Sequence, residues 1–128
     1  MRRAYLIPAA SVLGAASAWA QIPIPSKPGP QDGATLFRNQ CATCHSLNPA
    51  DPPRQGPLLK GLVGRKPGSV PGYKYTAGYG DVAFVWDAAH LDTYLTNPQA
   101  MFPGSTMLYR QANPDIRHRI IAYLEEQH

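Results

Sequence analysis

The sequence of 128 residues predicts an all-α fold, with three main helices and long loops in one domain. Three segments, which begin near Asp32, Asp87 and Asn113, carry apolar residues at helical spacing. The remainder is rich in turn formers, with 14 Pro and 11 Gly in the chain, and it lacks the alternation expected of strands.

The first helix is predicted to start at the N-cap Asp32 and to continue to Cys41. Gly33 and Phe37 lie four residues apart and therefore share a face. A small residue beside an aromatic one indicates close approach to another helix, and the C-terminal helix is the expected partner. Crossed terminal helices would close the fold.

The C-terminal helix has a strong start, with Asn113 as N-cap, Pro114 at the first helical position and Asp115 in the first turn. Its apolar stripe recurs every four residues, at Ile116, Ile120 and Leu124.

The third helix is predicted from Asp87 to about Leu95, and Asn97 with Pro98 should end it. About forty residues rich in Gly, Pro and Tyr precede it. Because they show no regular pattern, we expect them to wrap around a bound group.

Residues 41–45 read Cys-Ala-Thr-Cys-His, and C-x-x-C-H is the attachment sequence of c-type haem. Cys41 and Cys44, on one turn of the chain, can each form a thioether bond to a haem vinyl group. His45 would then lie under the ring as the proximal iron ligand. The motif predicts one covalently bound haem c.

Three other uses of Cys41 and Cys44 are weaker interpretations. A zinc site needs a second pair of ligands at regular spacing, and the chain has no other cysteine. A thioredoxin-like pair needs a βαβ context. A disulfide across two residues closes too small a loop to stabilise the chain much.

Residues 1–20 are predicted to be a secretory signal peptide. Arg2 and Arg3 precede a short apolar stretch, and residues 18–20 (Ala-Trp-Ala) fit a cleavage site. An uncleaved anchor is the alternative, although the apolar run is shorter than the ~20 residues of a spanning helix. Residues 21–31 are Pro-rich and are expected to form an extended arm, and residues 32–128 the haem domain. Export together with haem attachment predicts the periplasm of a bacterium.

The charge of the chain excludes little except nucleic-acid binding. The formal net charge is +4, and Arg2 and Arg3 contribute two of those charges in the segment expected to be removed. The basic residues are scattered, and aromatics are not interleaved with them.

Several motifs together resemble the class I cytochromes c, the small soluble family that includes mitochondrial cytochrome c and bacterial cytochrome c2. Gly33 and Phe37 precede the C-x-x-C-H motif as in that family. Residues 56–65 resemble its GPxLxGxxGR segment and residues 71–76 its PGYxYT segment. Trp86 matches a family tryptophan, and residues 94–98 match its Tyr-Leu-x-Asn-Pro run. Residues 103–107 resemble its PGTKM loop. The resemblance covers residues 32–124.

The resemblance implies an iron bound by His45 and Met107, with the Pro57 carbonyl holding the other ring nitrogen of His45. Met101 is expected to be a packing residue. Three histidines that could replace Met107 are expected at the surface: His90, His118 and His128.

Four further residues match family positions near the haem propionates: Arg65, Tyr75, Trp86 and Ser105. Tyr94 and Leu95 are implied to pack on the Met107 side of the haem. The chain departs from the family at Tyr79, where an Asn is common, at Thr106, where a lysine is usual, and in having few lysines.

With both axial positions filled, the resemblance implies an electron carrier and not an enzyme. Its expected partners are a donor dehydrogenase or quinol-oxidising complex and a terminal acceptor, and the protein is expected to be a monomer. The alternatives are a haem enzyme or gas sensor with an open distal position, and a fixed electron-transfer subunit of a complex.

Overall fold

The computed structural model describes residues 31–76 and 78–128. The predicted signal peptide and the Pro-rich arm up to residue 30 lie outside these residues. Among the described residues, no helix has the length and apolar character needed to cross a membrane.

Three helices correspond to the predicted ones: α1 (Gly33–Gln40), α2 (Ala88–Thr96) and α4 (Pro114–Glu125). The side chain of Asp32 accepts a hydrogen bond from the Thr35 amide, and that of Asp87 accepts one from the His90 amide. The side chain of Asn113 caps α4 at Asp115, with Pro114 in the first turn. The described residues contain no strand, so the all-α prediction is confirmed.

A fourth, short helix was not predicted: α3 (Pro98–Met101) follows α2 directly. The predicted stop at Asn97 is correct, because its backbone is extended, with φ −158° and ψ 90°. The fixed φ of Pro98 suits the first position of a helix, so the same dipeptide that ends α2 also starts α3.

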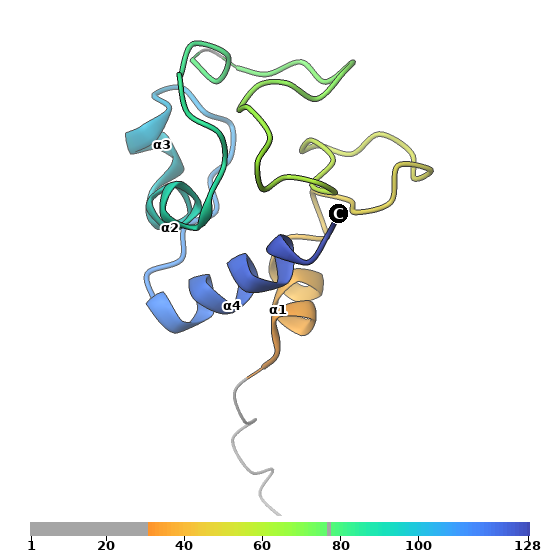
Figure 1. Ribbon diagram of the computed structural model, residues 1–128, viewed down its shortest axis with the longest axis vertical. Helices are drawn as coiled ribbons and strands as arrows, with labels where there is room; N and C mark the ends of the chain where they lie inside the picture. The colour runs from red at the N-terminus through yellow and green to blue at the C-terminus, as the bar shows by residue number, and fades with distance from the viewer. Residues whose placement is uncertain (1–30, 77) are drawn as a thin grey trace, which may run out of the picture.

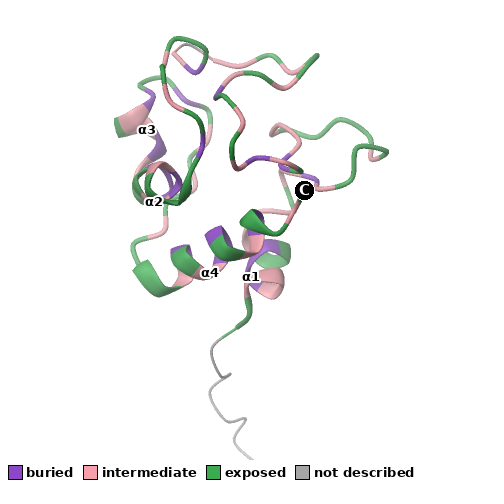
Figure 2. Ribbon diagram, viewed as in Figure 1, coloured by how far each residue is buried: buried purple, intermediate pink, exposed green. Residues whose placement is uncertain are grey.

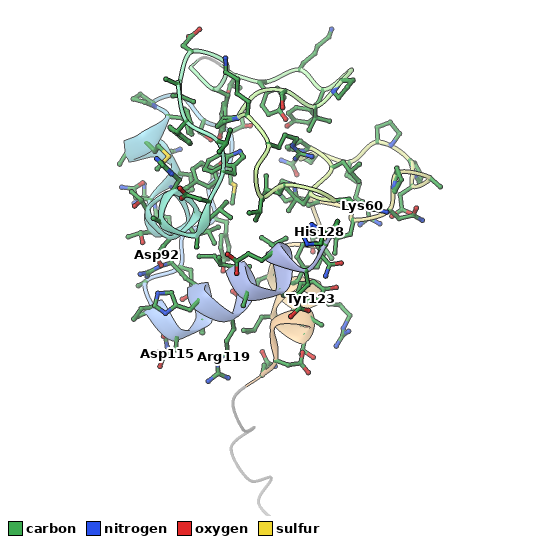
Figure 3. The ribbon with its side chains drawn as sticks, viewed as in Figure 1. Lys60, Asp92, Asp115, Arg119, Tyr123 and His128 are labelled. Atoms are coloured by element: carbon green, nitrogen blue, oxygen red, sulfur yellow. The ribbon has the colours of Figure 1, made fainter. Side chains whose placement is uncertain are left out.

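The terminal helices cross, as predicted, with α4 lying over α1 and also packing against α2 (Figure 1). The rings of Phe37 and Tyr123 lie 5.6 Å apart, and Tyr123 points toward α1 (Figure 3). A Cβ atom built on Gly33 would lie 2.7 Å from that of Tyr123 and would also meet the Arg119 carbonyl. Only glycine permits this approach.

Arg117 joins α4 to α2 through an ion pair. Its Nε donates to Oδ1 of Asp92 at 2.7 Å, and its Nη1 donates to the carbonyls of Gln111 and Ala112. Asp92 lies on α2 beside α4 (Figure 3).

Backbone hydrogen bonds tie the loops between α1 and α2 to the segment after α4 and to the segment before α2. The Gly61 amide donates to the carbonyl of Gln127, and the Gly64 amide donates to that of Trp86. Buried positions recur along α4 and α2 and in these loops (Figure 2). The core consists of Leu36, Phe37, Leu59, Leu62, Tyr79, Trp86, Leu91, Tyr94, Leu95, Phe102, Ile120, Ile121 and Leu124.

Candidate functional site

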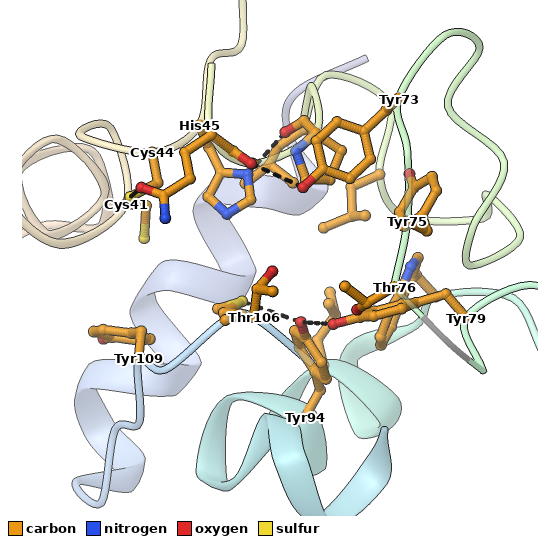
Figure 4. Close-up of a pocket in the computed structure, with 18 of the residues that line it drawn as sticks. Cys41, Cys44, His45, Tyr73, Tyr75, Thr76, Tyr79, Tyr94, Thr106 and Tyr109 are labelled. Atoms are coloured by element: carbon orange, nitrogen blue, oxygen red, sulfur yellow. Dashed lines mark hydrogen bonds between the residues drawn. The ribbon is translucent and has the colours of Figure 1, made fainter. Parts of the chain in front are cut away.

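His45 follows a tight turn at the end of α1. The amides of Cys44 and His45 both donate to the Cys41 carbonyl, at 3.1 and 3.0 Å, so the turn gathers residues 41–45. The two cysteine side chains lie beside the His45 ring (Figure 4). Burial raises the pKa of the Cys41 thiol to about 11. The thiol is therefore protonated near pH 7.

The His45 ring is oriented by the Pro57 carbonyl, which lies 2.8 Å from Nδ1. A carbonyl only accepts hydrogen bonds, so Nδ1 carries the proton and Nε2 keeps its lone pair. Burial lowers the pKa of His45, while the hydrogen bond to Pro57 raises it. The neutral imidazole is the form that binds a metal ion.

Gly56 provides the space for the His45 ring. Its amide donates to the Cys44 carbonyl at 2.7 Å, which presses this loop against the motif. A Cβ atom on Gly56 would lie within 2.7 Å of three atoms of the imidazole. The backbone at residue 56 therefore forms a wall against which His45 rests.

Met107 belongs to the facing side of the site, together with Tyr94. The Tyr94 hydroxyl donates to Sδ of Met107 at 3.1 Å, and the Met107 amide donates to Oγ of Ser105 at 3.2 Å. The loop reaches this position through Gly104, whose φ of 87° favours glycine. Figure 4 shows Tyr94 and Thr106 across an open space from His45.

Tyr79 lines the same side of the site, next to Tyr94. Its hydroxyl is 2.7 Å from that of Tyr94 and 2.6 Å from Oγ of Ser105. Its ring stacks on Phe102 with a centroid distance of 4.1 Å. Burial is the main reason that the pKa of Tyr94 is raised well above its usual value, so the hydroxyl keeps its proton.

Between these two sides lies a cavity of about 310 Å³ with mainly apolar walls. It is lined by residues from both ends of the chain and from the loops, among them Cys41, Cys44, His45, Pro57, Leu59, Leu62, Arg65, Tyr75, Trp86, Leu91, Tyr94 and Met107. Two thiols at one edge, an imidazole nitrogen on one side and a thioether on the other fit haem c. The apolar walls suit its macrocycle.

Three residues expected near the propionates line the cavity, and one does not. Arg65 donates to the carbonyls of Lys60 and Leu58, at 3.0 and 2.7 Å, so its charge is held by neutral partners. The Tyr75 hydroxyl accepts from the Val70 amide at 3.3 Å, and Trp86 is buried in the wall. Ser105 lies outside the cavity lining, because its hydroxyl turns toward Tyr79.

Sequence reasoning missed two residues of the site. Gly56 matched only a family motif, and its tight packing against His45 depends on the fold. Tyr79 stood out as a departure from the family pattern, and this departure was the signal that could have drawn attention to it.

Comparisons with known proteins agree with the geometry. The family model described as Cytochrome c matches residues 30–127. Cytochrome c2 of Rhodomicrobium vannielii is 37% identical over 119 residues, which cover 92% of this chain and 94% of that protein. Cytochrome c of Arabidopsis thaliana is 41% identical over 96 residues, which cover 74% of this chain and 86% of that protein. Cytochrome c of Sesamum indicum is 38% identical over 97 residues, which cover 75% of this chain and 87% of that protein.

A match of this extent shows the family, and the helical structure agrees with it. Proteins of this family bind haem c covalently through the C-x-x-C-H motif, whose cysteines in this chain are Cys41 and Cys44. This chain therefore belongs to the cytochrome c family, as a class I c-type cytochrome that carries covalent haem c and transfers electrons.

Proposed function

We propose that this protein is a periplasmic one-electron carrier whose haem iron is bound by His45 and Met107. With both axial positions filled by side chains, the site is suited to electron transfer and not to catalysis on a substrate. The proposal names the ligands and the compartment, which go beyond the family assignment.

The observation that carries the proposal is the pairing of His45 and Met107 in one cavity. The imidazole keeps its Nε2 lone pair because Nδ1 donates to Pro57 at 2.8 Å. The thioether of Met107 is oriented by the Tyr94 hydroxyl at 3.1 Å. Each ligand is thus held by a hydrogen bond, which limits its movement between oxidation states.

The bound haem supplies an iron that alternates between Fe(II) and Fe(III). The chain binds the macrocycle through Cys41 and Cys44, excludes water with apolar walls and supplies a thioether. A thioether is a soft ligand that favours Fe(II) and so raises the reduction potential. Arg65, Tyr75 and Trp86 are proposed to surround the propionates, with Arg65 supplying positive charge.

Residues 1–20 are proposed to direct export and to be removed, which leaves Gln21 as the first residue. The arm of residues 21–31 is proposed to be a spacer. The electron partners are proposed to be a dehydrogenase or quinol-oxidising complex and a terminal acceptor. The formal charge of the mature chain is small, so electrostatic steering toward these partners should be weak.

The ligand assignment is tested by the visible spectrum of the oxidised holoprotein. The wild type should show the weak sulfur-to-iron charge-transfer band, and Met107→Ala should lose it. Met101→Ala is the matched control, because Met101 is half-buried against the core and should keep the band. A high-spin wild type without the band would reject the assignment and would favour a haem enzyme or gas sensor.

The compartment is tested by cell fractionation and mass spectrometry. The holoprotein should appear in the periplasmic fraction with a mass that begins at Gln21. Gel filtration of the native extract should give a free monomer, whereas elution in a large complex would favour a fixed subunit. A mass that includes residues 1–20 would reject the cleaved signal.

A further inference from the structure

Three hydroxyl groups and the two ends of Met107 form a closed loop of contacts. The Met107 amide lies 3.2 Å from Oγ of Ser105, which lies 2.6 Å from the Tyr79 hydroxyl. The Tyr79 hydroxyl lies 2.7 Å from that of Tyr94, which lies 3.1 Å from Sδ of Met107. The path leaves the backbone of Met107 and returns to its side chain.

The direction of every hydrogen bond follows from counting protons. The thioether has no proton, so Tyr94 must donate its single hydroxyl proton to Sδ. Tyr94 can then only accept from Tyr79, which uses the one proton of Tyr79. Tyr79 must in turn accept from Ser105, and Ser105 accepts from the Met107 amide, which can only donate.

We propose that Tyr79 is a positioning residue that closes this one-way ring and strengthens the donor that Tyr94 offers to the Met107 thioether. This inference rests on the proposal that Met107 binds the iron. A thioether sulfur has two lone pairs, so one can serve the iron while the other accepts from Tyr94.

Packing fixes the Tyr79 hydroxyl in its place. The Tyr79 ring stacks on Phe102 at 4.1 Å with an angle of 17° between the planes. Tyr79 and Ser105 are 8% and 4% exposed, so the ring lies in a medium of low polarity. Hydrogen bonds that run in one direction polarise one another in such a medium, by about 10–30% per bond.

The expected consequence concerns the reduction potential. A stronger donor to Sδ withdraws electron density from the sulfur, which weakens its support of Fe(III) more than that of Fe(II). The complete ring therefore raises the potential. The proposed effect of the Tyr79 hydroxyl on the thioether passes through Tyr94, so removing that hydroxyl should not shift the potential when Tyr94 cannot donate.

The first experiment measures midpoint potentials of holoprotein variants. Tyr94→Phe should shift the potential to a lower value, and Tyr79→Phe should shift it in the same direction by less. The double variant should match Tyr94→Phe alone. An unshifted Tyr79→Phe, or a double variant whose shift is the sum of the single shifts, would overturn the proposal.

Two further variants separate the hydroxyl from the packing. Ser105→Ala should lower the potential, and Ser105→Thr, which restores a hydroxyl, should recover it. Tyr123→Phe, on the far contact between α4 and α1, is the tyrosine control and should leave the potential unchanged. Thermal unfolding of each variant shows that it is folded.

The second experiment reads the direction of the ring by proton NMR of the reduced holoprotein. The Tyr94 hydroxyl proton should give a nuclear Overhauser effect to the Met107 methyl group, and the Tyr79 proton should give one to the Tyr94 ring. A Tyr79 proton directed at Ser105 would show that the ring does not run in one direction and would overturn the proposal. The wild type could instead lack the sulfur-to-iron band and still show these nuclear Overhauser effects. That result would reject iron binding by Met107, while the one-way ring of hydrogen bonds would stand.

Discussion

Gly56 controls the position of His45 through the absence of a side chain. Its Cβ position lies within 2.7 Å of the imidazole atoms Cε1, Nδ1 and Nε2, while Pro57 holds the same ring from Nδ1. The ring is thus bounded by the Gly56 backbone and fixed by the next residue along the chain.

Gly56→Ala is expected to displace His45 and to destabilise the protein by about 1–3 kcal/mol, the usual range for overpacking a filled site. Denaturant unfolding of the holoprotein measures the loss, and the haem absorption bands should shift because the ligand moves. Gly80→Ala is the control, since a Cβ atom there meets nothing within 4 Å. Equal stability of the two variants would contradict the close packing.

Two groups of residues illustrate what the sequence can and cannot tell at this scale. The spacing of Cys41, Cys44 and His45 fixes their chemistry, because the turn that joins them is local. Tyr79 and Ser105 are 26 positions apart, and only the fold brings their hydroxyls to 2.6 Å. Sequence reasoning therefore could not give the contact between the hydroxyls of Ser105 and Tyr79.

Among the helices, the crossing of α1 and α4 depends on Gly33. A Cβ atom at this residue would meet backbone of α4 at Arg119, and backbone cannot rotate away as a flexible side chain can. The helices would have to separate.

Gly33→Ala is expected to lower the free energy of unfolding by roughly 1–3 kcal/mol. In an exposed helix the same change stabilises the protein by about 1 kcal/mol. The sign of the measured change therefore shows whether residue 33 is in close contact with α4. Chemical denaturation of the holoprotein measures it. A stabilised variant would show that the helices are farther apart than described.

The contact of α2 with α4 adds a pH-dependent part to the stability. The hydrogen bond from Arg117 is the main cause that lowers the pKa of Asp92, and the charges of Arg117 and His118 act in the same direction. A carboxyl group with a lowered pKa in the folded state stabilises above its unfolded pKa of about 3.9. That stabilisation is lost as the pH falls through the lower folded value.

Asp92→Asn is expected to cost about 1–3 kcal/mol at pH 7, as is typical of hydrogen bonds to charged groups. Urea unfolding from pH 7 to pH 3 should show a constant difference from wild type above about pH 5, and a shrinking one below about pH 4. In an Arg117→Gln background the substitution should have a much smaller effect. A difference that does not depend on pH would exclude the ion pair as its source.

At the scale of the whole molecule, the haem cavity is part of the core. Leu59, Leu62, Trp86 and Leu91 all line it. Without haem, these apolar side chains would face an unfilled and partly open cavity of about 310 Å³, so much of the core would lose its packing. Domains of this kind have a total stability of only about 5–15 kcal/mol.

The Cys41→Ser/Cys44→Ser variant, freed of haem, is therefore expected to lose most of its tertiary structure. Far-ultraviolet circular dichroism should show a large loss of helix compared with the holoprotein, and the thermal transition should be broad. Folding without haem, with native helix content and a cooperative transition, would show that the polypeptide core is sufficient alone.

The sequence by itself determined the parts that depend on neighbouring residues. The caps Asp32, Asp87 and Asn113 set the starts of three helices, and the spacing of residues 41–45 indicated the haem attachment. These signals are local, since a cap or a turn is formed within a few residues. The tertiary structure alone decided the wall that Gly56 forms against His45 and the ring of Tyr79, Tyr94, Ser105 and Met107. These features join residues that are distant in sequence, and their positions follow from how the loops pack around the haem cavity.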